Sequence, residues 1–183
     1  MSPILGIWAS AQTASSFGDY ESIATANGNG SATSFTFSSI PQTYTHLQLR
    51  FISRVASANY ALITFNGDSS ASNYTWHQLD GNGSAASAGG AASGTFGGAV
   101  VNFAAGGASG IYSAAIVDLL DYTNTNKYKT TRSLVGVDKN GSGNIALNSS
   151  AWLSTSAITS LSITFNGGFA IATGSQFALY GIK

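Results

Sequence analysis

Hydrophobic and polar residues alternate with a period of two along most of the chain. The alternation is clearest between residues 45 and 54, where Leu47, Leu49 and Phe51 are interleaved with His46, Gln48 and Arg50. Successive side chains of a β-strand point to opposite faces, so this pattern indicates a strand with one buried face. We expect His46 on the outward face of that strand, bonded to solvent or to a turn.

About ten or eleven segments predict strands in this way. They cover residues 20–26, 35–37, 45–54, 60–65, 74–79, 95–103, 111–120, 128–137, 144–153, 161–165 and 177–180. The run at 111–121 has some helical propensity, but its β-branched residues and its flanking Gly110 and Asn124 favour a strand.

Turn residues separate these segments. Gly paired with Asn or Ser occurs at residues 27–30, 66–68, 81–84, 140–143 and 166–168, and such pairs favour tight hairpins. Short strands separated by such turns, with no amphipathic helix, predict an all-β fold. We expect one antiparallel β-sandwich, similar to a jelly roll, over residues 17–183.

The first sixteen residues form a separate apolar segment. Ile4, Leu5, Ile7 and Trp8 give it hydrophobic surface that the chain's own sheet or another subunit would cover. The segment is too short, and lacks the preceding basic residues, for a secretion signal. No run approaches the roughly 20 apolar residues of a membrane-spanning helix. We therefore predict that residues 1–16 dock on a partner and that the chain does not insert into membranes.

Residues 81–110 consist mostly of Gly, Ala and Ser. The first interpretation of such a segment is a flexible surface loop, and the alternative is a place where neighbouring subunits approach closely. A second sequence feature is the recurrence of Ile-Thr-Phe-Asn-Gly at residues 63–67 and 163–167. Two strands that end in the same favoured turn explain it more simply than a duplicated half-domain.

Charged residues are scarce: only 8% of the 183 residues are Asp, Glu, Lys or Arg, and the formal net charge is zero. A typical soluble domain carries about a quarter, so a polybasic nucleic-acid surface is excluded. The absence of cysteine excludes disulfides and thiolate chemistry. Soluble monomers protect sheet edges with charge, and this chain has little. We therefore predict a permanent homo-oligomer, with a trimer as the expected symmetry.

Candidate catalytic and metal sites are weak. The chain has two histidines, no G-x-S-x-G motif and no phosphate-binding glycine pattern. Residues 138–143 begin like a calcium loop, but the twelfth position is Ser149 instead of the glutamate that such a loop requires. A polar hairpin turn explains the same residues, and residues 80–84 are a weaker copy of them. We predict no catalytic residue, no metal and no cofactor, and hence no enzyme.

One group of aromatic residues suggests a binding surface. Tyr74, Trp76 and His77 lie in one predicted strand, and at least one of them should meet solvent or a partner. Aromatic planes beside polar groups are typical of saccharide-binding surfaces, whereas Trp76 and Trp152 are more often core residues in a sandwich of this size. Both interpretations stay open at this point.

Several stretches together resemble short virion proteins of tailed bacteriophages. They are PILGIWAS at 3–10, FSSIPQTYTHLQLR at 37–50, FNGD at 65–68, NYTWH at 73–77, DLLDYTNTNKYK at 118–129 and FALYGIK at 177–183. The resemblance implies a structural protein of the phage particle that is made in the host cytoplasm, and it carries no catalytic residues. A tail fibre or minor tail component is the favoured role, and a capsid decoration protein is the alternative. The implied partners are further copies of the chain, other virion proteins and a host-surface glycan.

Overall fold

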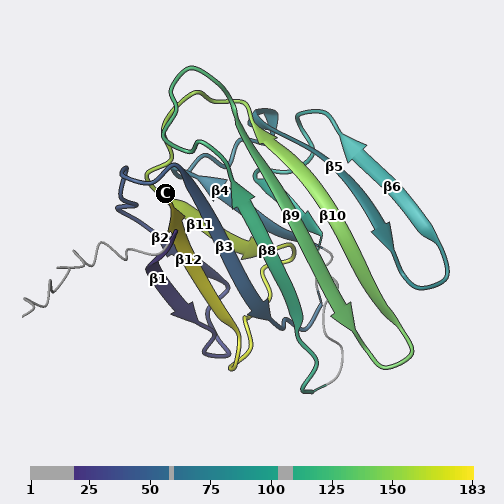
Figure 1. Cartoon of the computed structure of the whole chain (residues 1–183). Helices are drawn as coiled ribbons and strands as arrows, with labels where there is room; N and C mark the ends of the chain where they lie inside the picture. The colour runs from purple at the N-terminus through teal and green to yellow at the C-terminus, as the bar shows by residue number, and fades with distance from the viewer. Residues whose placement is uncertain (1–18, 58–59, 103–108) are drawn as a thin grey trace, which may run out of the picture.

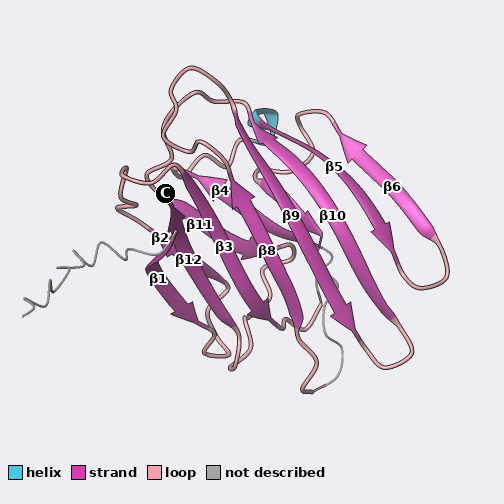
Figure 2. Cartoon of the chain, viewed as in Figure 1, coloured by secondary structure: helices cyan, strands magenta, loops and turns pink. Residues whose placement is uncertain are grey.

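The computed structural model describes residues 19–57, 60–102 and 109–183. This part of the chain folds into two antiparallel sheets that pack face to face (Figures 1 and 2). The strands are β1 (Tyr20–Asn27), β2 (Ser34–Phe37), β3 (His46–Ser53), β4 (Tyr60–Phe65), β5 (Tyr74–Gly81), β6 (Ala86–Ala91), β7 (Ala99–Asn102), β8 (Ser113–Leu119), β9 (Lys129–Asp138), β10 (Gly143–Trp152), β11 (Leu161–Phe165) and β12 (Gln176–Ile182). One short 3-10 turn, η1 (Ala71–Asn73), precedes β5. The prediction of an all-β sandwich is confirmed.

The strand order is that of a jelly roll with an extension. The larger sheet has the order β1-β12-β3-β8-β9-β10-β5-β6 and the smaller one β2-β11-β4-β7. Without β5, β6, β9 and β10, the remaining strands pair first with last, second with seventh, third with sixth and fourth with fifth. This nested pairing defines a jelly roll. We call these eight strands the jelly-roll frame, and β9-β10-β5-β6, which continue the large sheet beyond β8, the extension.

The hydrophobic core of the frame lies between the two sheets. Phe177 is fully buried at its centre, and its ring lies 5.2 Å from those of Phe35 and Phe51. Leu47, Leu49 and Phe51 of β3 all face inward, as their alternation with polar residues predicts. Residues 111–121, which have helical propensity, contain strand β8, which pairs with β3 on one side and β9 on the other.

Asn-Gly pairs form tight turns where the sequence predicts them, but not every such turn closes a hairpin. Residues 140–141 join the paired strands β9 and β10, whereas residues 66–67 end β4 where the chain leaves the small sheet for β5 of the large one. Asn66 and Gly67 have φ of 53° and 73°, and Asn140 and Gly141 have 56° and 101°. Positive φ at both central residues suits the twist of a tight hairpin, and Asn and Gly tolerate it best. The recurring pentapeptide forms the ends of β4 and β11, and the two copies pair with each other, with Ile63 opposite Ile163.

The prediction of a flexible loop over residues 81–110 is wrong for much of that segment. It contains β6, which pairs with β5, and β7, which pairs with β4. Its small residues allow close approach within one chain: a Cβ on Gly97 would lie only 2.2 Å from the Ser69 carbonyl oxygen. Ala, Ser and Gly have low strand propensity, and pairing with β5 outweighs it here.

The interior beneath the extension is more polar than the core of the frame. Ser133, Asn148 and Ser150 are buried on the inner faces of β9 and β10. The Ser150 hydroxyl accepts a hydrogen bond from the Val100 amide at 3.0 Å and donates to its carbonyl oxygen at 3.2 Å. This pair of bonds links β10 to β7 across the sandwich. The Ser133 hydroxyl, on the neighbouring strand, has no hydrogen-bond partner.

Candidate functional site: the open face of the eight-stranded sheet

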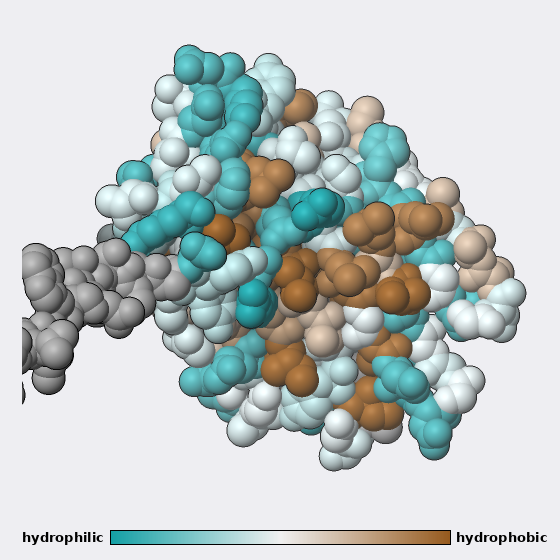
Figure 3. Space-filling view, viewed as in Figure 1, coloured by the Kyte–Doolittle hydropathy of each residue, from teal (hydrophilic) through white to brown (hydrophobic). Residues whose placement is uncertain are grey.

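The face of the large sheet that points away from the small sheet carries a block of exposed hydrophobic side chains. We call this side of the sheet the open face. Ile116, Leu134, Leu147 and Leu79 lie there on β8, β9, β10 and β5, with exposed fractions of 43%, 51%, 48% and 57%. Figure 3 shows the hydrophobic residues gathered over these strands, with hydrophilic residues around them. A contiguous apolar patch with a polar border is typical of an interaction surface.

The strand register aligns these four side chains into one row. Ile116 is opposite Leu134, Leu134 is opposite Leu147, and Leu147 is opposite Leu79. Their side chains therefore form a continuous ridge across four strands, and we call this row the ridge. Three of these strands, β8, β9 and β10, follow one another along the chain, and β5 comes from much earlier in the sequence, so the pairing register brings the row together.

A second row runs beside the ridge, two residues away from it on each strand, and we call it the furrow. It consists of Ala114, Gly136, Ile145 and Gly81, which are again opposite one another in that order. Three of the four residues are small, and Ile145, exposed to 59%, interrupts the row. Two hollows of about 270 and 290 Å³ result, one on each side of Ile145. The open face thus presents a ridge and an adjacent furrow of matching length.

A polar network borders the ridge on the side of β3. The Gln48 amide donates to Asp118 at 2.7 Å, and Arg132 donates to the other carboxylate oxygen of Asp118 at 3.0 Å. Arg50 donates to Gln48, and its guanidinium lies 5.0 Å from the Tyr20 ring centroid and 5.1 Å from that of Tyr180. Cation–π contacts of this kind fix the arginine over the aromatic rings. The row that contains the ridge therefore ends in polar groups on β3, although Ile52, two residues beyond Arg50 on the same strand, is 46% exposed.

Asp68 joins the frame to the extension. It follows the Asn66-Gly67 turn after β4, and its carboxylate accepts hydrogen bonds from the Trp152 indole at 2.7 Å, the Asn73 amide at 2.8 Å and the Ser70 backbone at 2.9 Å. Its carbonyl oxygen accepts a further bond from the Tyr74 hydroxyl at 2.8 Å. Asp68 alone, in the segment that follows β4, thus contacts both β5 and β10 of the extension.

The electrostatics of this joint follow from its contacts. Burial raises the pKa of Asp68, but the hydrogen bonds from Trp152, Asn73 and Ser70 outweigh that effect and hold the pKa below its ordinary value. Burial also raises the pKa of Tyr74 to about 12, so its hydroxyl stays protonated and keeps donating to Asp68. The segments FNGD at 65–68 and NYTWH at 73–77 thus contain the residues Asp68, Asn73 and Tyr74 whose hydrogen bonds join the frame to the extension.

Of Tyr74, Trp76 and His77, only His77 is exposed, which confirms that at least one of the three meets solvent, but the three side chains do not share one surface. Tyr74 is buried in the core, Trp76 is half-buried, and His77 points to the open face. The Trp76 ring packs inside, 6.1 Å from the Tyr60 centroid and 6.0 Å from that of Phe96. Because alternate residues of β5 face opposite sides, one ligand cannot contact all three. Trp152 is 3% exposed, which confirms its assignment to the core.

Ile4, Leu5, Ile7 and Trp8, together with the whole predicted docking segment 1–16, lie outside the described residues. The structure therefore leaves their docking role as a prediction.

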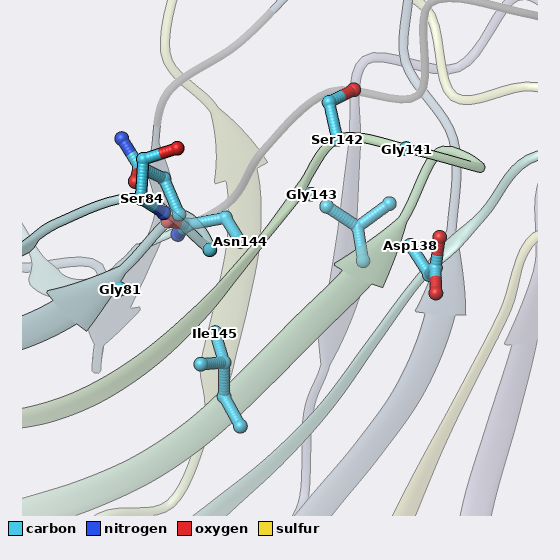
Figure 4. A pocket seen from close by; sticks show the side chains of 11 residues that line it. Gly81, Ser84, Asp138, Gly141, Ser142, Gly143, Asn144 and Ile145 are labelled. Carbon is cyan, nitrogen blue, oxygen red and sulfur yellow. Dashed lines mark hydrogen bonds between the residues drawn. The ribbon is translucent and has the colours of Figure 1, made fainter.

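Two hairpin turns line an open cleft of about 430 Å³ at one end of the extension (Figure 4). They contain both segments that resemble calcium loops. Figure 4 shows Ser84 and Asn144 on one side of the cleft and Asp138 on the other. The Asp138 carboxylate accepts a hydrogen bond from the backbone N–H of Asn140 at 2.8 Å. The side-chain oxygen of Asn82 accepts two, from the backbone N–H groups of Ser84 and Ala85 in the same turn. These oxygens stabilise the turns and do not converge on one point.

No metal or membrane feature appears in the described part of the chain. The His46 ring accepts a hydrogen bond from the Asp121 amide at 3.0 Å, as expected of a turn-bonded imidazole. Within residues 19–57, 60–102 and 109–183, no group of three or more His, Cys, Asp or Glu side chains could hold a metal ion. The same residues include no helix with the length and apolarity needed to cross a bilayer.

The chain was compared with protein-family models, curated proteins and solved structures, and nothing matches in any of the three. The open face is therefore identified from its geometry alone. Sequence reasoning missed it, although one signal was present: Leu134, Ile145 and Leu147 occupy the faces of their strands opposite the buried positions Val135 and Ala146.

Proposed function

We propose that this protein is a structural component of a bacteriophage particle, without catalytic activity, and that it belongs to the tail as a fibre or minor tail component. The observation that carries the proposal is the hydrophobic open face, whose ridge is roughly half exposed. Burying an exposed hydrophobic surface stabilises an assembly by about 25 cal/mol per Å². An isolated chain keeps this surface exposed to water and does not gain that stabilisation, so the working form is a larger assembly.

Two further features support this role. Jelly rolls are frequent in viral capsid and lectin domains, although a fold alone does not determine function. With 8% charged residues and no net charge, the chain has little electrostatic repulsion to keep copies apart. Self-association is therefore part of the proposal, as is contact with other virion proteins.

Quantitative mass spectrometry of purified particles tests the proposal. We expect the protein in the particle at a few tens of copies or fewer, as for a tail component. Hundreds of copies would transfer it to the head surface as a decoration protein. Its absence from washed, infectious particles would contradict the proposal, and shortening of host polysaccharide by the purified protein would contradict its non-enzymatic part.

A further inference from the structure

The open face is large enough for a stable interface. Six strands from β3 to β6, at about 4.8 Å spacing, and four rows of outward residues, at about 6.8 Å, give a footprint of roughly 800 Å². A standard protein–protein interface buries about 800 Å² on each partner. Interfaces also combine an apolar centre with a polar rim, and the open face has both.

The ridge and the furrow are complementary to each other. A two-fold axis that runs parallel to the rows, between ridge and furrow, would place the ridge of each copy over the furrow of the other. Ile116 would then face a second copy's Ala114, Leu134 its Gly136, and Leu79 its Gly81. On β8, β9 and β5, a large side chain of one copy would therefore face a small residue of the other. On β10, Leu147 of one copy would face Ile145 of the other.

The charges on β9 obey the same two-fold relation. Arg132 and Asp138 lie on the open face of this strand, one row outside the ridge and one row outside the furrow. The axis that places Leu134 over Gly136 also places Arg132 of each copy opposite Asp138 of the other. Isologous interfaces require such self-complementarity, and β9 provides it in both shape and charge.

We propose that the open face binds a second copy of this chain, face to face, about this two-fold axis. The inference rests on the proposed function, in which the face is buried in an assembly, and it names the partner. The two large sheets stack about 10 Å apart, as aligned sheets do. A two-fold contact builds dimers, so it replaces the trimer expected from the sequence.

Sedimentation equilibrium of the full chain tests the proposal. We expect a mass of about 37 kDa, twice the 18.6 kDa of one chain. Leu134→Lys should raise the dimer dissociation constant by a factor of about 30 or more, as for a residue at the centre of an interface. Thr130→Lys adds the same charge to the same exposed side of β9 outside the ridge and furrow, and should have little effect. Circular dichroism verifies that each variant folds.

A second variant distinguishes shape-specific dimerisation from non-specific hydrophobic association. Gly136 has an ordinary backbone conformation, and a Cβ there would meet nothing closer than the Asn144 carbonyl oxygen at 3.9 Å, so Gly136→Leu should fold. The added leucine side chain would fill the furrow, so we expect Gly136→Leu to raise the dimer dissociation constant about tenfold or more. If the chains associated only through non-specific hydrophobic contact, the same substitution would lower that constant. Adding Leu134→Ala exchanges large and small residues and should restore most of the affinity.

Several results would overturn the proposal. They are a wild-type monomer at high concentration, a trimer that Leu134→Lys leaves intact, or tighter association of Gly136→Leu. A monomer that is nevertheless incorporated into particles would show that another virion protein covers the face, and the proposed function would stand. A specific dimer that is absent from particles would refute the proposed function and leave this inference intact.

Discussion

Strand β3 of the jelly-roll frame and strand β9 of the extension distribute hydrophobic and polar residues differently. In the frame, β3 buries Leu47, Leu49 and Phe51 and turns Gln48 and Arg50 to the open face. In the extension, β9 buries Thr131 and Ser133 along with Val135 and Val137, and it exposes Leu134. The frame therefore has the interior of a self-sufficient domain. The extension has a weaker interior and a hydrophobic exterior, which is the distribution expected of strands that are covered on both faces in the working assembly.

The largest expected effect tests the frame. Phe177→Ala removes the ring that lies between Phe35, Phe51 and Phe165 in the core. Truncation of a fully buried phenylalanine costs about 3–5 kcal/mol, because contacts are lost and a cavity is left. Urea denaturation should show this loss in the free energy of unfolding. A loss below about 1 kcal/mol would mean that the frame does not provide most of the stability.

The next effect tests the joint between the two regions. Asp68→Asn keeps the size of the side chain but removes the charge that accepts bonds from Trp152, Asn73 and Ser70. We expect the free energy of unfolding at pH 7 to fall by about 1–3 kcal/mol.

The pH dependence of that effect is determined by the lowered pKa of Asp68. A carboxyl group with a lowered pKa in the folded state stabilises the fold above its unfolded pKa of about 3.9, and this contribution is lost as the pH falls through the folded value. The difference between wild type and Asp68→Asn should therefore shrink in denaturation experiments between pH 5 and strongly acidic pH. A constant difference across that range would contradict the charge-based account.

A matched pair of serines tests the polar interior of the extension. Ser150→Ala leaves the buried Val100 amide without its side-chain acceptor, and should cost about 1–2 kcal/mol of unfolding free energy. Ser133→Ala, at the equivalent depth on the neighbouring strand, removes a hydroxyl that has no partner. It should be neutral or slightly stabilising. Equal costs for the two variants would show that packing, not hydrogen bonding, holds β10 to β7.

The smallest expected effect concerns the open face in the isolated chain. Leu134→Ser changes a half-exposed side chain, so its effect on the unfolding of dilute, monomeric protein should stay within about 0.5 kcal/mol. A loss of 2 kcal/mol or more in the monomer would mean that the ridge stabilises the fold itself and is not reserved for a partner.

The sequence was sufficient for the frame because the frame depends on local signals. Alternation placed Leu47, Leu49 and Phe51 in the core, and the Asn-Gly pair at residues 66–67 located the tight turn that ends β4. The ridge could not be predicted in the same way. It depends on the register between β8, β9, β10 and β5, which is a non-local property that no single segment encodes.

Two further differences have local causes. Strand β6 has the composition of a loop, and only its pairing with β5 makes it a strand. Tyr74 looked available to a ligand, yet its hydroxyl is bonded to the Asp68 carbonyl oxygen inside the joint. In both cases tertiary contacts outweigh the preference of the segment.

The central claim is that the ridge is buried in the native assembly, and the absence of cysteine from the sequence makes a direct test possible. Leu134→Cys and Thr130→Cys introduce one thiol each, both on the outward side of β9. Their rates of reaction with a maleimide are measured in concentrated and in dilute protein. We predict that Cys at 134 is protected at high concentration and becomes reactive on dilution, while Cys at 130 reacts in both conditions. Equal and fast labelling of both positions at every concentration would contradict the account.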